Sequence, residues 1–269
     1  GVGVVIVLQL MRLAQCFGRG GTWGGGILMA YENVPENKRS FYAAIPQIGL
    51  PIGFGLSSIL IAVPTLLLPE DIFFTWGWRI PFLAAIILTV IVIRQKGEMM
   101  ETEDYKKAQA KLEAEEAEGK KHKVGFIPMV KGYWKTLLLG CGTRWVDGTF
   151  YNIFIVWILS YCINWLGMLL IQTYIITIIA CIFKIPFTLF GGWCAQKLGN
   201  TRTFVIGALA SAVLSIPTLK VIELSKGNLA ITIIGIVLGW SIAYNLIWAV
   251  ISSLWSSYFE TEVRYSGIS

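Results

Sequence analysis

The sequence predicts an all-α polytopic membrane protein with about seven transmembrane helices. Of its 269 residues, 55% are hydrophobic and only 14% are charged, whereas about 25% of the residues in an average soluble domain are charged. The mean hydropathy is +0.67. A soluble fold cannot bury this much apolar surface, because its exterior must be largely polar and charged. Apolar runs of spanning length recur along the chain, so a bilayer is expected to cover much of this surface.

A helix that crosses a bilayer needs about 20 mostly apolar residues. Stretches of this kind occur at about 2–31, 43–68, 78–95, 135–161, 167–193, 203–222 and 229–253. Between the third and the fourth, residues 96–134 are mostly polar and are rich in Ala, Glu and Lys. Their acid-to-base spacing suits a solvated helix. The chain therefore divides into three spans, a charged loop and four further spans.

The distribution of Lys and Arg predicts the orientation of these spans. Fifteen of these residues fall in 32–42, 94–135, 194–202 and 254–269, and only three fall in the connectors on the opposite side. By the positive-inside rule, the long loop and the C-terminal end are cytoplasmic. The net charge of +6 is explained by this topology, with some attraction to anionic lipid, so no nucleic acid partner is expected.

The composition excludes several chemistries. The single histidine, His122, lies in the charged loop, so histidine-ligated metal sites and histidine-based catalytic triads are not expected. The five cysteines form no C-x-x-C pair, and no His-Glu-x-x-His or serine-nucleophile motif is present. The sequence therefore predicts no enzyme, no metal site and no cofactor.

The first span carries two arginines, Arg12 and Arg19, seven residues apart and therefore nearly on one helix face. Glycines four residues apart lie around Arg19 and would let another helix approach closely. Two interpretations stay open. The arginines either snorkel from a packing seam to the interface, or face a water-filled cavity and hold an anionic substrate or bias a proton site.

The second span contains Gly49, Pro51 and Gly53 close together. This combination interrupts regular helical hydrogen bonding and predicts a kink or a flexible point.

The fourth span carries Arg144 and Asp147, whose i, i+3 spacing lets them pair on one helix face. Asp147 is the only carboxylate within any predicted span. A lone intramembrane carboxylate beside an arginine suits proton coupling, because its protonation responds to burial and to the partner's charge. The alternative is a structural ion pair near the inner end of the helix.

Polar residues in the later spans have two possible roles. Lys184 is expected to snorkel towards the cytoplasm, with ligand contact as the alternative. Tyr151, Asn152 and Tyr244 either line a cavity or make packing contacts and interhelical hydrogen bonds.

Four motifs resemble those of one transporter family. Arg12-Leu-Ala-Gln-Cys-Phe-Gly-Arg-Gly-Gly-Thr-Trp-Gly-Gly-Gly is similar to the fourth-helix signature of the metabolite:proton symporters, a branch of the major facilitator superfamily that includes shikimate, ketoglutarate, citrate and proline/betaine carriers. Pro46–Gly53, Trp76–Leu83 and Glu262–Ser269 resemble its fifth helix, the start of its sixth helix and the loop after its tenth helix. They occur in the family's order.

The resemblance implies a partial major facilitator superfamily fold, a fragment covering about helices 4–10 of twelve. Residues 1–95 would be helices 4–6 of the N-terminal half, and 96–134 the cytoplasmic loop between the halves. Residues 135–269 would be helices 7–10 of the C-terminal half and the following loop. The function it implies is secondary active transport in the bacterial inner membrane. A small organic acid or zwitterion would be carried, with protons as the coupling ion, by alternating access.

The resemblance also assigns expected roles to residues of this chain. Those expected to bind substrate are Arg19, Thr22, Tyr151, Asn152 and Tyr244. Those expected to set the electrostatics or to couple protons are Arg12, Arg144 and Asp147. Gating or structural roles fall to Gly49, Pro51, Gly53, Lys197, Arg202 and Arg264.

Two departures from the family pattern matter. Thr22 stands where the family usually has a glutamate, so that carboxylate cannot handle protons here. Gln196 stands at an aspartate position in the loop between helices 8 and 9, which weakens the gating ion pair expected there.

Two other function classes remain as alternatives. The chain could be a non-transporting truncated remnant. It could also be a seven-helix receptor or photoreceptor, in which Lys184 would be the only lysine available to bind retinal. The sequence does not identify a substrate.

Overall fold

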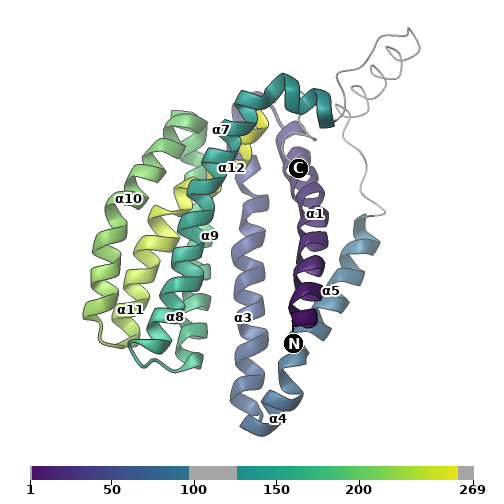
Figure 1. Cartoon of the computed structure of the whole chain (residues 1–269). Coiled ribbons are helices and arrows are strands. Elements are labelled where there is room, and N and C mark those ends of the chain that lie inside the picture. Colours follow the sequence, from purple (N-terminus) through teal and green to yellow (C-terminus); the bar gives the residue numbers. More distant parts are fainter. Residues whose placement is uncertain (1, 97–125, 260–269) are drawn as a thin grey trace.

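The computed structural model describes residues 2–96 and 126–259, without the side chains of 2, 17–22, 95–96 and 126–129. The described residues form helices joined by short turns, most of them running side by side along one direction (Figure 1). A bilayer offers no hydrogen-bond partners to the backbone, so a helix, which satisfies its own peptide groups, is the expected form of each apolar run.

The first part of the chain contains three long helical segments. Helix α1 covers Val2–Glu32 without a break. The second segment is composed of η1 (Glu36–Lys38), α2 (Arg39–Ala44), η2 (Pro46–Ile48) and α3 (Gly49–Leu67). The third follows the short helix α4 (Glu70–Thr75) and comprises η3 (Gly77–Arg79) and α5 (Ile80–Lys96).

The second part contains four long segments, two of which include a π-helical turn. The first comprises α7 (Phe126–Asn152), the π-helical η4 (Ile153–Trp157) and α8 (Ile158–Asn164). The next two are α9 (Leu170–Leu198) and α10 (Asn200–Leu224). The last comprises α11 (Leu229–Ile236), the π-helical η5 (Val237–Ala243) and α12 (Asn245–Tyr258).

The prediction of an all-α polytopic membrane protein is confirmed. Among the described residues, six helical segments are long and apolar enough to cross a membrane: Glu36–Leu67, Gly77–Arg94, Val130–Asn164, Leu170–Leu198, Asn200–Leu224 and Leu229–Tyr258. Helix α1 is 31 residues long and contains the shorter apolar stretch Gly3–Cys16, which makes it the seventh candidate. The division into two halves and the orientation stay predictions, and residues 97–125 of the charged loop lie outside the described part.

The interruption of the second segment lies earlier than the sequence suggests. The α-helical pattern changes at η2, directly before Gly49, and α3 is helical through Pro51 and Gly53. Pro51 falls in the first turn of α3, where its missing N–H would have no helical acceptor in any case. The gating role of these three residues stays a prediction.

Helix α9 is central to the packing. It contacts α3, α12, α2, η5 and α10. Small residues permit the closest approaches: a Cβ at Gly191 would lie 2.6 Å from that of Ala249, and one at Gly207 would lie 2.8 Å from that of Leu246. These contacts join α9 and α10 to α12, as small residues do at interfaces between membrane helices.

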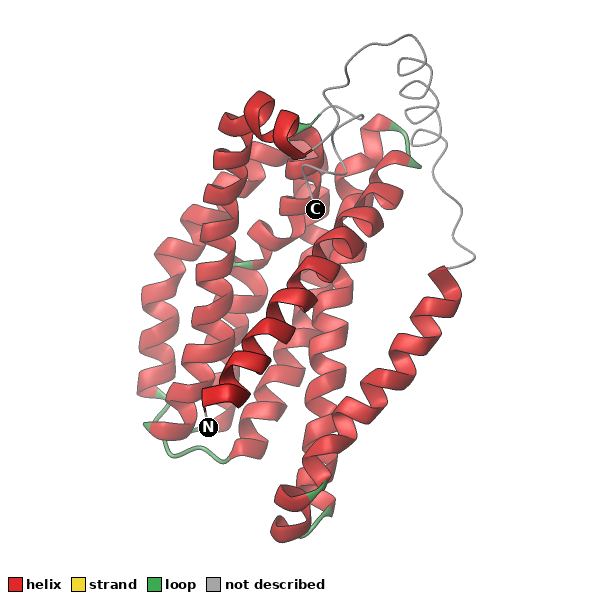
Figure 2. Ribbon diagram, turned by 45° about the vertical axis from the view of Figure 1, so that its right-hand side comes forward, coloured by secondary structure: helices red, strands yellow, loops and turns green. Residues whose placement is uncertain are grey.

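Helix α5 has the opposite character. Only 6% of the window Gly77–Arg94 is buried, and large apolar side chains such as Phe82 and Ile93 are exposed. Figure 2 shows this helix, which leads to the undescribed loop, standing apart from the main bundle. The polar cluster described below is instead formed by residues of α7, of α9 and of the segment Leu229–Tyr258.

Candidate functional site

Three buried polar residues lie at the middle of three different segments. Asp147 is the middle residue of Val130–Asn164, Lys184 is the middle residue of Leu170–Leu198, and Tyr244 lies at the middle of Leu229–Tyr258. Their exposed fractions are 2%, 0% and 0%. The contacts described below bring the three residues together at one level of the bundle, and the middle of a spanning helix is expected near the centre of the bilayer.

Asp147 is held by two donors. Arg144 Nη1 donates to Asp147 Oδ2 at 2.6 Å, and Tyr244 Oη donates to Asp147 Oδ1 at 2.6 Å. The distance from Tyr244 lies within the usual range for an O–H donor to a carboxylate, and the distance from Arg144 lies just below the usual range for a charged N–H donor. The Arg144 side chain is 53% exposed whereas that of Asp147 is 3% exposed. The i, i+3 pair expected from the spacing is therefore present, with a tyrosine from another segment as an additional partner.

Two π-helical turns lie in the segments that carry this contact. In η5, the Tyr244 N–H donates to the Gly239 carbonyl five residues earlier, at 3.0 Å. Gly239 leaves room for the ring of Phe154, which lies in η4, and a Cβ at Gly239 would collide with that ring. The wider turns thus pack against each other, and η5 ends directly before Tyr244. π-Helical turns often occur at functional sites, but no residue pattern in the sequence indicated these two.

Lys184 does not snorkel, and that expectation is wrong. Its side chain is fully buried, with Nζ 4.6 Å from the ring centroid of Trp240 and 4.5 Å from that of Tyr244. The middle of α9 is roughly 20 Å from either helix end at 1.5 Å per residue, and a lysine side chain cannot reach that far. The Lys184 carbonyl accepts a hydrogen bond from Asn245 Nδ2 at 2.9 Å, which ties α9 to α12.

The other residues predicted to bind substrate or to set the electrostatics lie in varied surroundings. Tyr151 is half-buried, and its ring packs edge-on against Phe54 of α3 at 6.3 Å. Asn152 is exposed and donates to the Gly148 carbonyl of its own helix. Arg12 is exposed, with Nη1 3.5 Å from Gln15 Oε1. Arg19 and Thr22 lie in α1, but their side chains are outside the described part.

At the end of α9, hydrogen bonds of the neutral Gln196 side chain occur where the family resemblance led us to expect an ion pair. Gln196 Oε1 accepts a hydrogen bond from the Phe41 N–H at 3.3 Å, and Gln196 Nε2 donates to the Asn37 carbonyl. One amide thus donates and accepts across the contact between α9 and the η1–α2 region, which a carboxylate could not do. Sequence reasoning identified this position but not its two partners.

The residues with predicted gating roles near Gln196 are not part of this connection. Lys197 is exposed, with Nζ 4.2 Å from the ring centroid of Trp193, and Arg202 is exposed at the start of α10. Arg264 lies outside the described residues. The gating role of all three stays a prediction.

A second connection, missed by sequence reasoning, involves Gln47. Its side chain is 2% exposed, accepts from Trp23 Nε1 at 3.3 Å and donates to the Trp248 carbonyl at 3.2 Å. Trp248 Nε1 donates back to the Gln47 carbonyl at 3.1 Å. These bonds join α1, η2 and α12. A lone glutamine inside an apolar run was the available signal.

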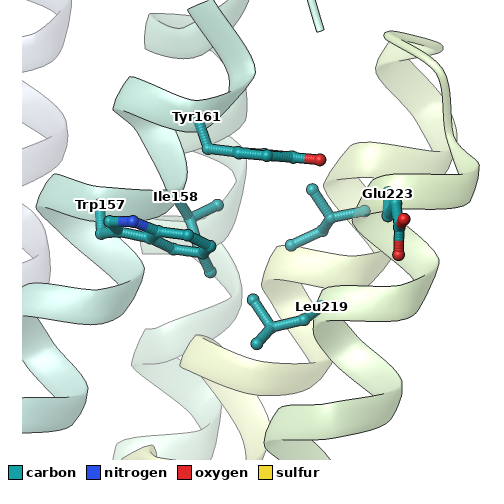
Figure 3. A pocket seen from close by; sticks show the side chains of 6 residues that line it. Trp157, Ile158, Tyr161, Leu219 and Glu223 are labelled. Atoms are coloured by element: carbon teal, nitrogen blue, oxygen red, sulfur yellow. The ribbon is translucent and has the colours of Figure 1, made fainter. Parts of the chain in front are cut away.

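A pocket of about 110 Å³ lies elsewhere, between the η4–α8 region and α10 (Figure 3). It is lined by Trp157, Ile158, Tyr161, Leu219, Ile222 and Glu223. None of the residues that sequence reasoning singled out lines it, so it is distinct from the cluster around Asp147. Among residues 2–96 and 126–259, no three His, Cys, Asp or Glu side chains gather as they would around a metal ion.

Comparison with known proteins finds bacterial transport proteins of similar sequence. The chain is 27% identical to the inner membrane metabolite transport protein YhjE of Escherichia coli, over 100% of this chain and 60% of that protein. It is 27% identical to the glycine betaine/proline/ectoine/pipecolic acid transporter OusA of Dickeya dadantii, over 100% of this chain and 53% of that protein. It is 26% identical to the shikimate transporter of Escherichia coli, over 97% of this chain and 58% of that protein.

The chain therefore spans between about half and three-fifths of the length of these relatives. No solved structure matches it. The family model of the Major Facilitator Superfamily, a family of transporters and not of enzymes, matches residues 2–269. This match covers every helix described above and argues against the receptor alternative. The chain belongs to the Major Facilitator Superfamily.

Proposed function

We propose that this chain is part of a secondary active transporter that carries a small organic acid or zwitterion together with protons, by alternating access. Its relatives include proteins named as transporters of shikimate, proline and glycine betaine, and each of these compounds has a carboxylate. The proposed location is a bacterial inner membrane, with the 96–134 loop and the C-terminal end in the cytoplasm. This location rests on the basic residues of the connectors and on the inner membrane relative.

The observation that supports proton coupling most strongly is the burial of Asp147. An ionised carboxylate at this depth is costly unless it is paired, and here Arg144 and Tyr244 supply the pairing. When Asp147 takes up a proton, both donors lose their anionic partner and the net charge of the cluster rises by one. An anionic substrate group then restores the balance. Proton and substrate binding therefore favour each other, and by linkage the effect is reciprocal, which supports coupling of the two.

Arg19 stays a proposed anion clamp on helix α1, because its place in the family motif supports that role. Thr22, Tyr151, Asn152 and Tyr244 stay proposed cavity residues, and Arg12 is proposed to set the local electrostatics. Of these, Tyr244 has the strongest support, because it contacts Asp147 directly.

The test uses the complete transporter of which this chain is proposed to be part. It is reconstituted in proteoliposomes, with labelled proline, glycine betaine or shikimate as probes. The wild type is expected to accumulate at least one probe when a proton gradient is imposed. Asp147→Asn is expected to lose this accumulation while keeping exchange of the probe down its own gradient. Asp71→Asn, which changes an exposed carboxylate of α4, is the matched control and is expected to behave as the wild type.

Two outcomes would contradict the proposal. Accumulation by Asp147→Asn at the wild-type rate and with the same dependence on the gradient would remove Asp147 as proton carrier. Absence of uptake of every probe by the wild type would favour the non-transporting alternative.

A further inference from the structure

The most unusual group in the described part of the chain is the Lys184 ammonium. It is completely buried, and among the described residues Nζ has no hydrogen-bond acceptor. The Trp240 Nε1–H, on one of the rings that cover it, also lacks an acceptor there, and Trp240 is 1% exposed. Buried donors nearly always have acceptors, since an unpaired polar group away from water is strongly unfavourable and an unpaired charge more so. Two neighbouring donors that lack acceptors among the described residues indicate a place for an acceptor that these residues do not supply.

The surroundings of Lys184 stabilise the positive charge without satisfying its hydrogens. Nζ lies 4.6 Å from the ring centroid of Trp240 and 4.5 Å from that of Tyr244, within the range of cation–π attraction. The ring faces supply negative potential but no lone pair in hydrogen-bonding position. Asp147, the buried carboxylate of the cluster, is occupied by Arg144 and Tyr244 instead. Nζ is therefore left available to an acceptor that the described residues do not provide.

The position of the two rings connects Lys184 to the first part of the chain. Trp240 packs edge-on against Phe54 of α3 with 6.3 Å between centroids, and Phe54 packs in the same way against Tyr151. Beside Phe54, a Cβ at Gly55 would lie 3.5 Å from that of Cys181, so α3 and α9 approach closely here. The two donors thus lie where α3 meets α9 and η5, near the middle of the spans. Transporter sites are typically found at this depth, between the parts of the fold that move.

We propose that Lys184 Nζ and Trp240 Nε1 form the subsite that binds the carboxylate of the transported molecule. This inference rests on the proposed transport function and specifies its substrate class. A carboxylate provides lone pairs for both donors and neutralises the ammonium. Proton uptake by Asp147 leaves Arg144 and Lys184 without any anion in the cluster, so the carboxylate binds most tightly when Asp147 is protonated. A substrate that carries only positive charge is excluded, because the aromatic rings already enclose the chain's own ammonium.

The test measures thermal unfolding of the purified full chain in detergent, with pairs of compounds that differ in the carboxylate. The pairs are proline and its methyl ester, glycine betaine and choline, and shikimate and its methyl ester. At least one carboxylate is expected to raise the unfolding temperature of the wild type in a saturable manner, while its partner compound does not.

Three variants locate the effect. Lys184→Met is expected to raise the half-saturating concentration at least about 30-fold, as for loss of one partner of a buried charge pair. Trp240→Phe keeps a ring but loses the donor, and an increase of about fivefold is expected. Lys135→Met is the matched control, since it removes an exposed ammonium 5.7 Å from the ring centroid of Trp134, and no change is expected.

Without ligand, Lys184→Met is expected to unfold at a higher temperature than the wild type, because an apolar side chain replaces an uncompensated buried charge.

The inference is overturned if no carboxylate stabilises the wild type more than its partner compound does, or if Lys184→Met retains the wild-type half-saturating concentration. Failure of the proposed proton coupling would give a different combination of results. Carboxylate-specific stabilisation that depends on Lys184, in a protein whose uptake ignores the proton gradient, would support the subsite and contradict proton symport. Proton-driven uptake that Lys184→Met leaves unchanged would support symport and overturn the subsite.

Discussion

Replacing Tyr244 by phenylalanine tests whether the hydrogen bond to Asp147 is a bond to a charged carboxylate. Tyr244 is fully buried, and Oη donates to Asp147 Oδ1 at 2.6 Å. Phenylalanine keeps the ring, including its contact with Lys184, and removes only the hydroxyl. The change therefore affects one oxygen of one carboxylate, while Arg144 continues to bind the other oxygen.

The expected magnitude follows from the charge of the acceptor. A hydrogen bond to a charged group contributes about 1.5–3 kcal/mol to stability, compared with about 0.5–1.5 kcal/mol for a neutral pair. Tyr244→Phe should therefore lower the free energy of unfolding by about 1.5–3 kcal/mol. In an Asp147→Asn background the acceptor is a neutral amide, and the same change should cost about 0.5–1.5 kcal/mol. The two mutations are thus expected to couple by about 1 kcal/mol.

The assay is equilibrium unfolding in mixed micelles, followed by circular dichroism, of the wild type, both single variants and the double variant. Tyr161→Phe serves as a control, because the Tyr161 ring stacks on Trp157 at 5.5 Å and packing is retained in the variant. Independent mutations add to within about 0.3–0.5 kcal/mol. A Tyr244→Phe effect that is equal in the two backgrounds within that range would refute a charged acceptor at position 147.

Two further predictions concern packing. Gly239→Ala forces a Cβ into the buried ring of Phe154 and should destabilise the protein by about 1–3 kcal/mol. Gly142 has open space around it, so Gly142→Ala should be neutral or should stabilise the protein by up to about 1 kcal/mol. Equal unfolding midpoints for these two variants would show that η5 does not pack as described. Gln196→Leu removes both hydrogen bonds to the segment that contains Asn37 and should lower the free energy of unfolding by about 1–3 kcal/mol; an unchanged midpoint would contradict a role for this amide in joining α9 to that segment.

The sequence was sufficient for features that depend on local chain properties. Membrane-spanning helices were predictable because the bilayer imposes both a minimum apolar length and internal backbone hydrogen bonding. The Arg144–Asp147 contact was predictable because i, i+3 residues share a helix face whatever surrounds the helix. The interruption of the second segment was predicted only approximately, since Pro46 and Pro51 are both compatible with the start of a helix.

Features that depend on contacts between helices were not predictable in the same way. The bond from Tyr244 to Asp147 joins residues 97 positions apart. Lys184 lies on a helix whose buried face carries small and polar residues such as Thr177 and Thr188 at helical spacing, but this pattern does not show how deep the ammonium lies. The π-helical turns depend on the fit of Gly239 to Phe154, which lies in another segment. In each case the deciding partner is distant in sequence.

The arrangement of the buried charges itself bears on function. The simplest way to stabilise Asp147 and Lys184 would be a direct ion pair, but among the described residues Lys184 Nζ has no hydrogen-bond partner and Asp147 binds Arg144. Tyr244 is in contact with both, through its hydroxyl and through its ring face. If stability alone mattered, apolar side chains in these positions would serve at least as well. An anion that is already paired, beside a cation that is not, is instead the arrangement expected of a site that gains and loses a charged ligand. A change of charge at Asp147 then alters how strongly Lys184 attracts that ligand, with Tyr244 in contact with both groups.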